Sequence, residues 1–336
     1  MIKNLKYLPV LVIAAMVLLH HAYAQQAPRD TSFTFNSAFL SVKKANPNAS
    51  IPLVNPGDSI GSKRDIIYCT VNGHQLKLDI FWPKKGFGGK IPAILVVFGG
   101  GWRSGDRSMH VPMAQELAAR GYVAITVDYR LSTEALYPAA VNDLKTAIKW
   151  IRANAKTYNI DDKKIATWGF SAGGQLATLV GTTGGSPLYK GNGVYDKFSD
   201  KVQAIVDVDG TLAFIHPESG EGDDSKKTSA ATYWFGSGKN VHPELWQEAS
   251  PLNHIDKNTP PIMFLNSGVD RMHAGRTDVI RKLNSLYIYH EVHAFAGAPH
   301  PFIMFNPWFT PSLNYTVDFL DKVFGRKKQE REIEKS

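Results

Sequence analysis

A serine in a glycine-bounded turn is the first feature of this sequence that points to chemistry. Ser171 lies in Gly-Phe-Ser-Ala-Gly at positions 169–173, which matches the pattern G-x-S-x-G. Residues 164–168 are predicted to form a short strand, and the small residues of 172–183 predict a helix. In this frame the glycines permit a tight turn that exposes the hydroxyl, and the free N–H groups of the helix face developing negative charge. The motif therefore predicts a nucleophilic serine for acyl transfer.

A run of three glycines is the second such feature. Gly99, Gly100 and Gly101 directly follow the apolar run 91–98. Three consecutive glycines cost chain entropy, so they are expected where the backbone must approach a ligand closely. We expect the N–H groups of Gly100 and Gly101, with that of Ala172, to form an oxyanion hole. The alternative is a tight turn with no ligand.

Hydrophobic patterning predicts the elements that position these residues. Runs 65–71 and 74–82 flank Asn72-Gly73, a strong hairpin signal. Apolar runs and amphipathic segments then alternate, which predicts an α/β fold: a mostly parallel sheet with an antiparallel N-terminal edge and helices on both faces. The other expected strands are 91–98, 121–129, 164–168, 202–208, 261–267 and 288–295, and the clearest helices are 138–158, 172–183, 276–286 and 312–324.

From about residue 76 to 324 the chain resembles the acetyl esterase and lipase branch of the α/β-hydrolases. It is similar to the hormone-sensitive-lipase-like and feruloyl or acetylxylan esterase-like members. The family motif begins with His where this chain has Phe98, which removes a side-chain hydrogen bond from the loop but leaves the backbone donors. The motifs that carry the resemblance are FGGGWRSGD (98–106), DYRL (128–131), YPAAVNDL (137–144), GFSAGG (169–174), SPL (250–252), SGVD (267–270) and APHPF (298–302).

The resemblance implies the α/β-hydrolase fold and the order serine, aspartate, histidine for a catalytic triad. Asp270 follows the predicted strand 261–267, and His300 follows the predicted strand 288–295. Ser171 would attack the ester carbonyl, His300 would transfer its proton to the leaving alcohol, and Asp270 would orient the imidazole. The alternatives are Asp209 as the acid, and His293 or His273 as the base.

The stretch 210–254 has no clear periodicity, and we interpret it as a cap insertion over the site. An ordinary surface excursion is the alternative. Four aromatic residues are predicted to wall the substrate pocket, although core packing accounts for most tryptophans. These candidates are Trp102, Phe170, Trp246 and Trp308.

The N-terminus has the pattern of a secretory signal peptide. Lys3 and Lys6 precede an apolar run at 8–19, and Ala22-Tyr23-Ala24 provides a small-residue cleavage site. We expect residues 1–24 to be removed and the protein to be secreted or periplasmic, with an uncleaved anchor as the alternative. Residues 25–64 are then an extended lead-in, 65–325 the catalytic domain and 326–336 a charged tail.

Composition narrows the function classes. The 336 residues carry 38 Lys+Arg and 30 Asp+Glu, a net charge of +8 with no basic stripe, so nucleic acid is not an expected partner. Cys69 is the single cysteine, which excludes an intrachain disulfide. No metal or nucleotide cofactor is implied, no membrane span is expected after cleavage, and the sequence carries no signal for oligomeric state.

The function expected from these features is an exported serine carboxylesterase that hydrolyses short-chain acyl esters. Its substrate would be a small-molecule or polysaccharide ester, such as the acetyl or feruloyl groups of plant polysaccharide. Two alternatives remain. One is a serine exopeptidase of the prolyl-oligopeptidase type, which shares the triad but normally carries a long N-terminal propeller. The other is a catalytically inactive binding protein on the same fold.

Overall fold

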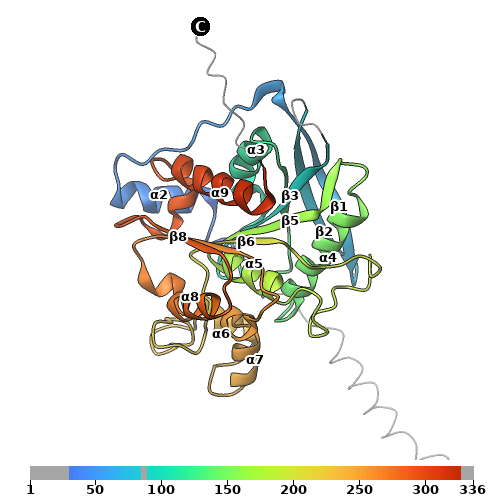
Figure 1. The fold of residues 1–336 in the computed structure, drawn as a ribbon. Helices are drawn as coiled ribbons and strands as arrows, with labels where there is room; N and C mark the ends of the chain where they lie inside the picture. Colours follow the sequence, from blue (N-terminus) through green and yellow to red (C-terminus); the bar gives the residue numbers. More distant parts are fainter. Residues whose placement is uncertain (1–29, 85–88, 327–336) are drawn as a thin grey trace, which may run out of the picture.

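A single mixed sheet of eight strands runs through the molecule (Figure 1). The computed structural model describes residues 30–84 and 89–326. The strand order is β1-β2-β4-β3-β5-β6-β7-β8; β2 pairs antiparallel with β1 and β4, and the strands from β4 to β8 pair in parallel. This confirms the predicted α/β class with an antiparallel N-terminal edge. The strands are β1 Ile60–Val71, β2 His74–Pro83, β3 Ile91–Val97, β4 Val123–Val127, β5 Ile160–Phe170, β6 Ala204–Val208, β7 Ile262–Asn266 and β8 His290–Ala294.

Helices cover both faces of the sheet. In Figure 1, α3 and α9 lie on one side, and α4, α5 and α8 lie on the other. Each face has its own hydrophobic core, because successive side chains of a buried strand point to opposite faces. The helices are α2 Phe35–Ala45, α3 Val111–Ala119, α4 Ala139–Ala153, α5 Ala172–Thr182, α6 Ala230–Phe235, α7 Pro243–Glu248, α8 Arg276–Ser285 and α9 Phe309–Phe324.

The N-terminal segment corrects one prediction. Residues 25–64 were expected to be an extended lead-in, but they contain the helix α2, and β1 begins at Ile60. Thr34 caps α2 through a reciprocal capping box with Ser37. Two phenylalanines of α2 lie against Phe305, with ring centroids 5.2 and 5.4 Å away. The segment is therefore part of the packed structure. The predicted signal peptide and most of the charged tail lie outside the described residues.

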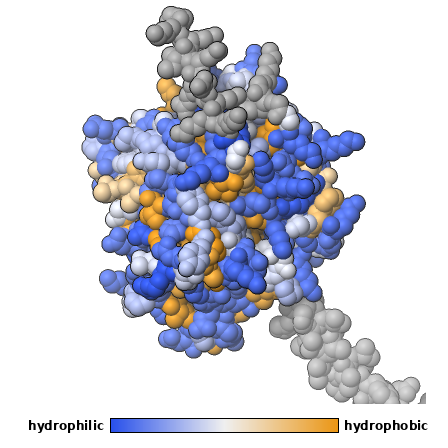
Figure 2. All heavy atoms as spheres, viewed as in Figure 1, coloured by the Kyte–Doolittle hydropathy of each residue, from blue (hydrophilic) through white to orange (hydrophobic). Residues whose placement is uncertain are grey.

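The outer surface is mainly hydrophilic, with smaller hydrophobic areas between the polar residues on the face seen in Figure 2. Among the described residues, no helix combines the length and the apolar character needed to cross a bilayer.

One titratable side chain, that of His110, lies deep in the hydrophobic core that contains Trp168 and Phe170. His110, which ends a 3₁₀ turn at Arg107–His110, is 3% exposed, and its ring packs edge-on against Trp168 and Phe170. Its Nε2 has no hydrogen-bond partner among the residues that the structure describes. Burial lowers the pKa of His110 from its ordinary value of 6.5 to about 3.

His110 should therefore make the fold sensitive to acid. The unfolded chain binds a proton at this histidine below about pH 6.5 and the folded chain does not, so stability is lost as pH falls from there toward pH 3. The cost at about pH 4.5 is about 2 to 3 kcal/mol. His110→Phe keeps an aromatic ring without the proton. Urea unfolding at about pH 7.5 and about pH 4.5 should show a smaller drop for His110→Phe than for wild type. An equal drop in both proteins would contradict this assignment.

Candidate active site

Ser171 lies at the junction of β5 and α5, in a turn that only small neighbours permit. Its backbone has φ +57° and ψ −123°, and its N–H donates to the carbonyl of Val208 at 2.8 Å. A Cβ at Gly169 would lie 2.0 Å from the carbonyl oxygen of Gly173, and a Cβ at Gly173 would lie 2.3 Å from that of Val97. Both glycines of the motif are thus required by close backbone contacts. The predicted strand, turn and helix are confirmed.

A chain of hydrogen bonds joins three side chains from separate parts of the sequence. His300 Nε2 lies 2.8 Å from Ser171 Oγ, and His300 Nδ1 lies 2.9 Å from Asp209 Oδ2. The imidazole is 17% exposed and the carboxylate is fully buried. With the ring proton on Nδ1, which faces the carboxylate, Nε2 is left to accept the serine hydroxyl proton. The ring of His300 also packs on Phe170, 4.8 Å between centroids.

The expectation that Asp270 is the acid partner of His300 is wrong on this geometry. Asp270 begins a 3₁₀ turn, Asp270–His273, and its side chain is completely exposed, 3.9 Å from His273. The turn directs its buried residue, His273, inward and its carboxylate outward. Asp209, the alternative acid, instead follows β6, whose last residue, Val208, accepts the N–H of Ser171. Of the alternative bases, His293 lies on β8 and bonds Glu291 at 2.9 Å.

Asp209 is held by the end of the next strand. Its Oδ1 accepts the N–H of Ser267 at 2.9 Å and the amide of Asn266 at 3.5 Å, and Arg276 donates to Asn266 at 2.6 Å. Its backbone has φ +51°, an unusual value for a residue other than glycine. Burial, and then the charge of Asp209, raises the pKa of the neighbouring Asp207 well above its ordinary value. The carboxylate that faces His300 is therefore fixed in position, and burial disfavours a second negative charge on Asp207 beside it.

The glycine loop lies beside Ser171. Gly100 has φ +128°, and a Cβ there would lie 2.2 Å from the carbonyl oxygen of Ser104. The N–H groups of Arg103 and Ser104 donate to the Gly100 carbonyl, so the loop is a tight turn. Gly100, Gly101 and Ala172 also line the same cavity as Ser171 and His300, as an oxyanion hole requires.

Phe98, which stands where the related esterases have His, is held in another way. Its ring stacks on Tyr129 with centroids 4.4 Å apart and planes 17° apart. The Tyr129 hydroxyl donates to the Phe98 carbonyl at 3.0 Å. The start of the loop is therefore anchored by a stacked pair and a backbone hydrogen bond.

The cavity over Ser171 has a volume of about 630 Å³, and four further stretches of chain line it beside Ser171, Ala172, Asp209 and His300. They are the N-terminal segment at Asp30–Phe33, the glycine loop, the turn at Arg271 and Met272, and the insertion 210–254. The insertion contributes Glu221, Ser229 and Tyr233. Residues of this stretch thus line the same cavity as Ser171, and its role as a cap stays a prediction. The contributions of the N-terminal segment and of Tyr233 were not predicted from the sequence.

Of the four aromatic residues predicted to wall the pocket, Trp102 alone is among the cavity-lining residues of the described chain. Its ring is 3% exposed, donates to Gln175 at 2.9 Å and stacks on Trp234 at 5.1 Å. Phe170 and Trp246 are fully buried, and Trp308 packs against the core beside α9. These three predictions are wrong because the apolar rings are used for packing.

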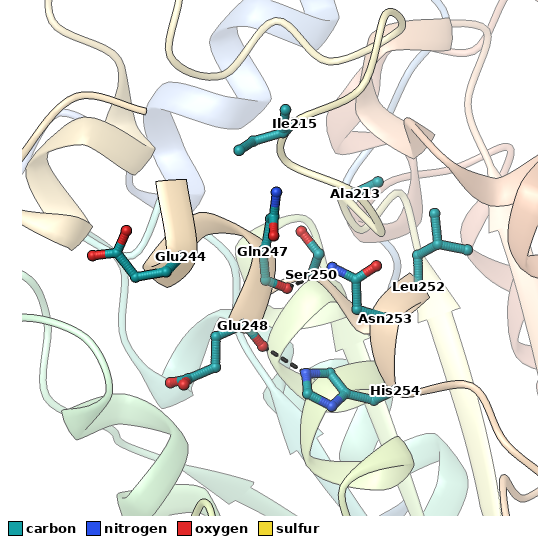
Figure 3. A pocket seen from close by; sticks show the side chains of 9 residues that line it. All are labelled: Ala213, Ile215, Glu244, Gln247, Glu248, Ser250, Leu252, Asn253 and His254. Carbon is teal, nitrogen blue, oxygen red and sulfur yellow. Dashed lines mark hydrogen bonds between the residues drawn. The ribbon is translucent and has the colours of Figure 1, made fainter. Parts of the chain in front are cut away.

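A second cavity of about 610 Å³ lies within the insertion 210–254, beside a 3₁₀ turn at Pro251–His254. Figure 3 shows its polar lining, which includes Gln247, Asn253 and His254, with His254 Nε2 bonded to the Glu248 carbonyl at 2.6 Å.

Across the residues that the structure describes, no group of three or more His, Cys, Asp or Glu side chains is placed to hold a metal ion.

Known structures share this fold. The match to a bifunctional GH43-CE protein of Bacteroides eggerthii has a TM-score of 0.66 at 25% identity, over 78% of this chain and 38% of that one. A thermophilic esterase of Thermogutta terrifontis matches with a TM-score of 0.67 at 24% identity, over 82% of this chain and 96% of that one. The sheet, and the serine, histidine and aspartate at its carboxyl edge, define the α/β-hydrolase class.

Sequence comparisons identify the family. A family model described as BD-FAE matches residues 78–274 of the 336. The chain belongs to the BD-FAE family. Esterase LipC of Mycobacterium tuberculosis is 31% identical over 198 residues, which is 57% of this chain and 48% of LipC. The probable carboxylic ester hydrolase LipM of the same organism is 26% identical over 191 residues, 55% of this chain and 42% of LipM. The chain thus spans about half the length of these curated relatives.

Proposed function

We propose that this protein is a serine carboxylesterase that hydrolyses short-chain acyl esters through an acyl-enzyme. The observation that carries the proposal is the hydrogen-bonded chain Ser171–His300–Asp209 at the floor of a cavity. Relatives named esterase and carboxylic ester hydrolase support the same activity.

In the acylation step, Ser171 Oγ attacks the ester carbonyl carbon while its proton passes to His300 Nε2. Asp209 stabilises the imidazolium that forms. The carbonyl oxygen becomes an oxyanion, which accepts hydrogen bonds from the backbone N–H groups of the glycine loop and Ala172. When the tetrahedral intermediate collapses, the carbon–oxygen bond to the alcohol breaks, and His300 gives its proton to the leaving oxygen.

Deacylation repeats these steps with water as the nucleophile. His300 Nε2 takes a proton from the water, whose oxygen attacks the acyl carbon. The bond to Ser171 Oγ then breaks, the serine regains its proton from His300, and the carboxylic acid leaves. Because His300 acts first as base and then as acid in both half-reactions, one imidazole is sufficient for the whole reaction.

The packing behind Ser171 favours a small acyl group. Trp102 is fixed between Gln175 and the stacked ring of Trp234, and Gln175 is itself held by the Ala249 carbonyl at 2.8 Å. A long acyl chain directed against Trp102 would have to displace this buried group, at a large packing cost. We therefore favour acetyl over feruloyl among the esters of plant polysaccharide proposed as natural substrates. Support for a polysaccharide substrate comes from the expected export signal and from the likeness to the GH43-CE protein.

An acyl-chain panel tests this function. Wild-type protein should hydrolyse p-nitrophenyl esters with the highest kcat/KM for acyl groups of about two to four carbons, and methyl ferulate more slowly. A fluorophosphonate probe should label Ser171, located by mass spectrometry of the tryptic peptides. Labelling without ester hydrolysis, but with cleavage of prolyl peptides, would favour the exopeptidase. Absence of both labelling and hydrolysis would favour the binding protein.

We also propose that the protein is exported and that residues 1–24 are removed. The basic, apolar and small-residue regions of the N-terminus support this. N-terminal sequencing of protein from the periplasm or medium of an expressing bacterium should begin at Gln25. Recovery of the full chain from the membrane fraction would instead indicate an uncleaved anchor.

A further inference from the structure

We propose that Tyr233 is the platform on which the sugar ring of the leaving alcohol rests, and that Arg103 and Asp30 hold this platform in place. The inference rests on the proposed hydrolysis of saccharide esters and adds the residues that recognise the sugar.

Three segments distant in sequence meet at the rim of the catalytic cavity. Asp30 belongs to the N-terminal segment, Arg103 follows the glycine loop, and Tyr233 lies on α6 of the insertion; all three line the cavity. The Arg103 guanidinium carbon lies 4.0 Å from the centroid of the Tyr233 ring, and Arg103 Nε donates to Asp30 Oδ2 at 3.0 Å. One guanidinium thus joins the N-terminal segment to the insertion, directly beside the loop that faces Ser171.

Tyr233 differs from its neighbours on α6. Trp234 and Phe235 are 0% and 5% exposed and pack into the core. Tyr233 is 45% exposed and is one of the residues that line the catalytic cavity. A large aromatic residue left open to the catalytic cavity is a strong candidate for ligand contact. Because the cation–π contact with Arg103 orients the ring, binding a ligand against it costs less conformational entropy.

The groups around the ring match a saccharide better than an alkyl alcohol. Ser32, Glu221 and Thr228 line the same cavity and provide hydroxyl and carboxylate groups. A pyranose presents C–H bonds on its face and hydroxyls at its edge. Its face can therefore pack on the Tyr233 ring while its hydroxyls form hydrogen bonds with these polar groups. An alkyl alcohol would bury the polar groups without hydrogen bonds. Asp30 neutralises the charge of Arg103, so this pair does not itself attract a charged sugar.

The experiment compares two acetyl esters whose alcohols differ. One is an acetylated xylo-oligosaccharide, and the other is ethyl acetate, which has no ring; acid release is followed in a pH-stat. In Tyr233→Ala, the ratio of kcat/KM for the saccharide to that for ethyl acetate should fall about five- to tenfold, mainly through KM. Tyr233→Phe should keep the wild-type ratio because it keeps the ring. Arg103→Met should lower the ratio by a smaller factor because the ring loses its support.

Tyr287→Ala is the matched control, since Tyr287 is 97% exposed and lies after α8; it should behave as wild type. If Tyr233→Ala folds poorly, Tyr233→Leu removes the aromatic face at similar volume and should lower the ratio equally. Unacetylated xylo-oligosaccharide should also inhibit ethyl acetate hydrolysis, with a higher inhibition constant in Tyr233→Leu than in wild type.

If the ratio of kcat/KM values is unchanged in Tyr233→Ala, or falls equally in Tyr233→Phe, the proposed role of the Tyr233 ring is wrong. Hydrolysis of ethyl acetate by wild type without any action on the saccharide would overturn the saccharide inference and leave the esterase proposal standing. If neither ester is hydrolysed and Ser171 is not labelled, the esterase proposal itself fails.

Discussion

Asp209→Asn is expected to lower kcat on a short acyl ester by about 10⁴-fold. Asp209 Oδ1 accepts the Ser267 N–H, so an asparagine in this place would keep its oxygen there and turn its NH₂ group toward His300 Nδ1. Nδ1 would then have to accept, which places the ring proton on Nε2. The imidazole would be held in a tautomer that cannot take the proton of Ser171. Steady-state kinetics on p-nitrophenyl acetate measure the loss.

The matched control for this prediction is Asp270→Asn, since Asp270 is the acid that the family resemblance implies. Its side chain is completely exposed, and we expect less than about a twofold change in kcat. The reverse result, with Asp270→Asn strongly impaired and Asp209→Asn near wild type, would refute the pairing of His300 with Asp209. Circular dichroism and thermal melts establish that both variants are folded.

Ser171→Ala is expected to show the largest effect, a fall in kcat of about 10⁶-fold, because no other atom in the proposed mechanism can form the acyl-enzyme. The protein should remain folded. Alanine keeps the Cβ that serine already places at φ +57°, so the substitution adds no backbone strain. The hydroxyl that is lost bonds His300, which stays packed on Phe170 and bonded to Asp209.

Pre-steady-state measurements, together with thermal melts, separate this loss from unfolding. Wild type should release a burst of nitrophenol as the acyl-enzyme accumulates, and Ser171→Ala should release none while melting near the wild-type temperature. Substantial residual hydrolysis by Ser171→Ala at high purity would mean that another nucleophile carries the reaction.

The proposed nucleophile could be predicted from local pattern, and the proposed base from the order of residues that the family resemblance implies. Ser171 needs only a strand, a turn with glycines and a helix, all of which are encoded within about 20 residues. His300 was indicated by its place after the last predicted strand. The alternation of buried strands and amphipathic helices was likewise sufficient for the α/β class, since each element carries its own periodicity.

The acid could not be chosen in this way, because two aspartates follow buried strands and both strands end at the same edge of the sheet. The choice depends on how the chain turns after β7, where a short 3₁₀ turn buries His273 and leaves Asp270 in solvent. One local signal favoured Asp209: it is a charged residue that directly continues an apolar strand and precedes a glycine. The family resemblance, in contrast, implies Asp270 as the acid.

The N-terminal helix and the aromatic residues were missed for different reasons. Phe35, Ala38, Phe39 and Val42 have helical spacing, but α2 is only 11 residues long and lies in polar surroundings. The prediction that tryptophans line the pocket used only their residue type, but the rings that are buried in the core cannot contact a substrate. Tyr233 is the exposed member of its cluster, and exposure is a property of the tertiary structure.

In the proposed mechanism the carboxylate after β6 orients His300, so the segment after β7 takes no part in proton transfer. Arg271 and Met272 of that segment still face the cavity. Turnover and substrate preference are thereby assigned to different stretches of backbone. A library randomised at positions 270–272 should retain cleavage of simple esters in most folded members while altering which alcohols are accepted, so this short turn is the natural place to re-engineer selectivity.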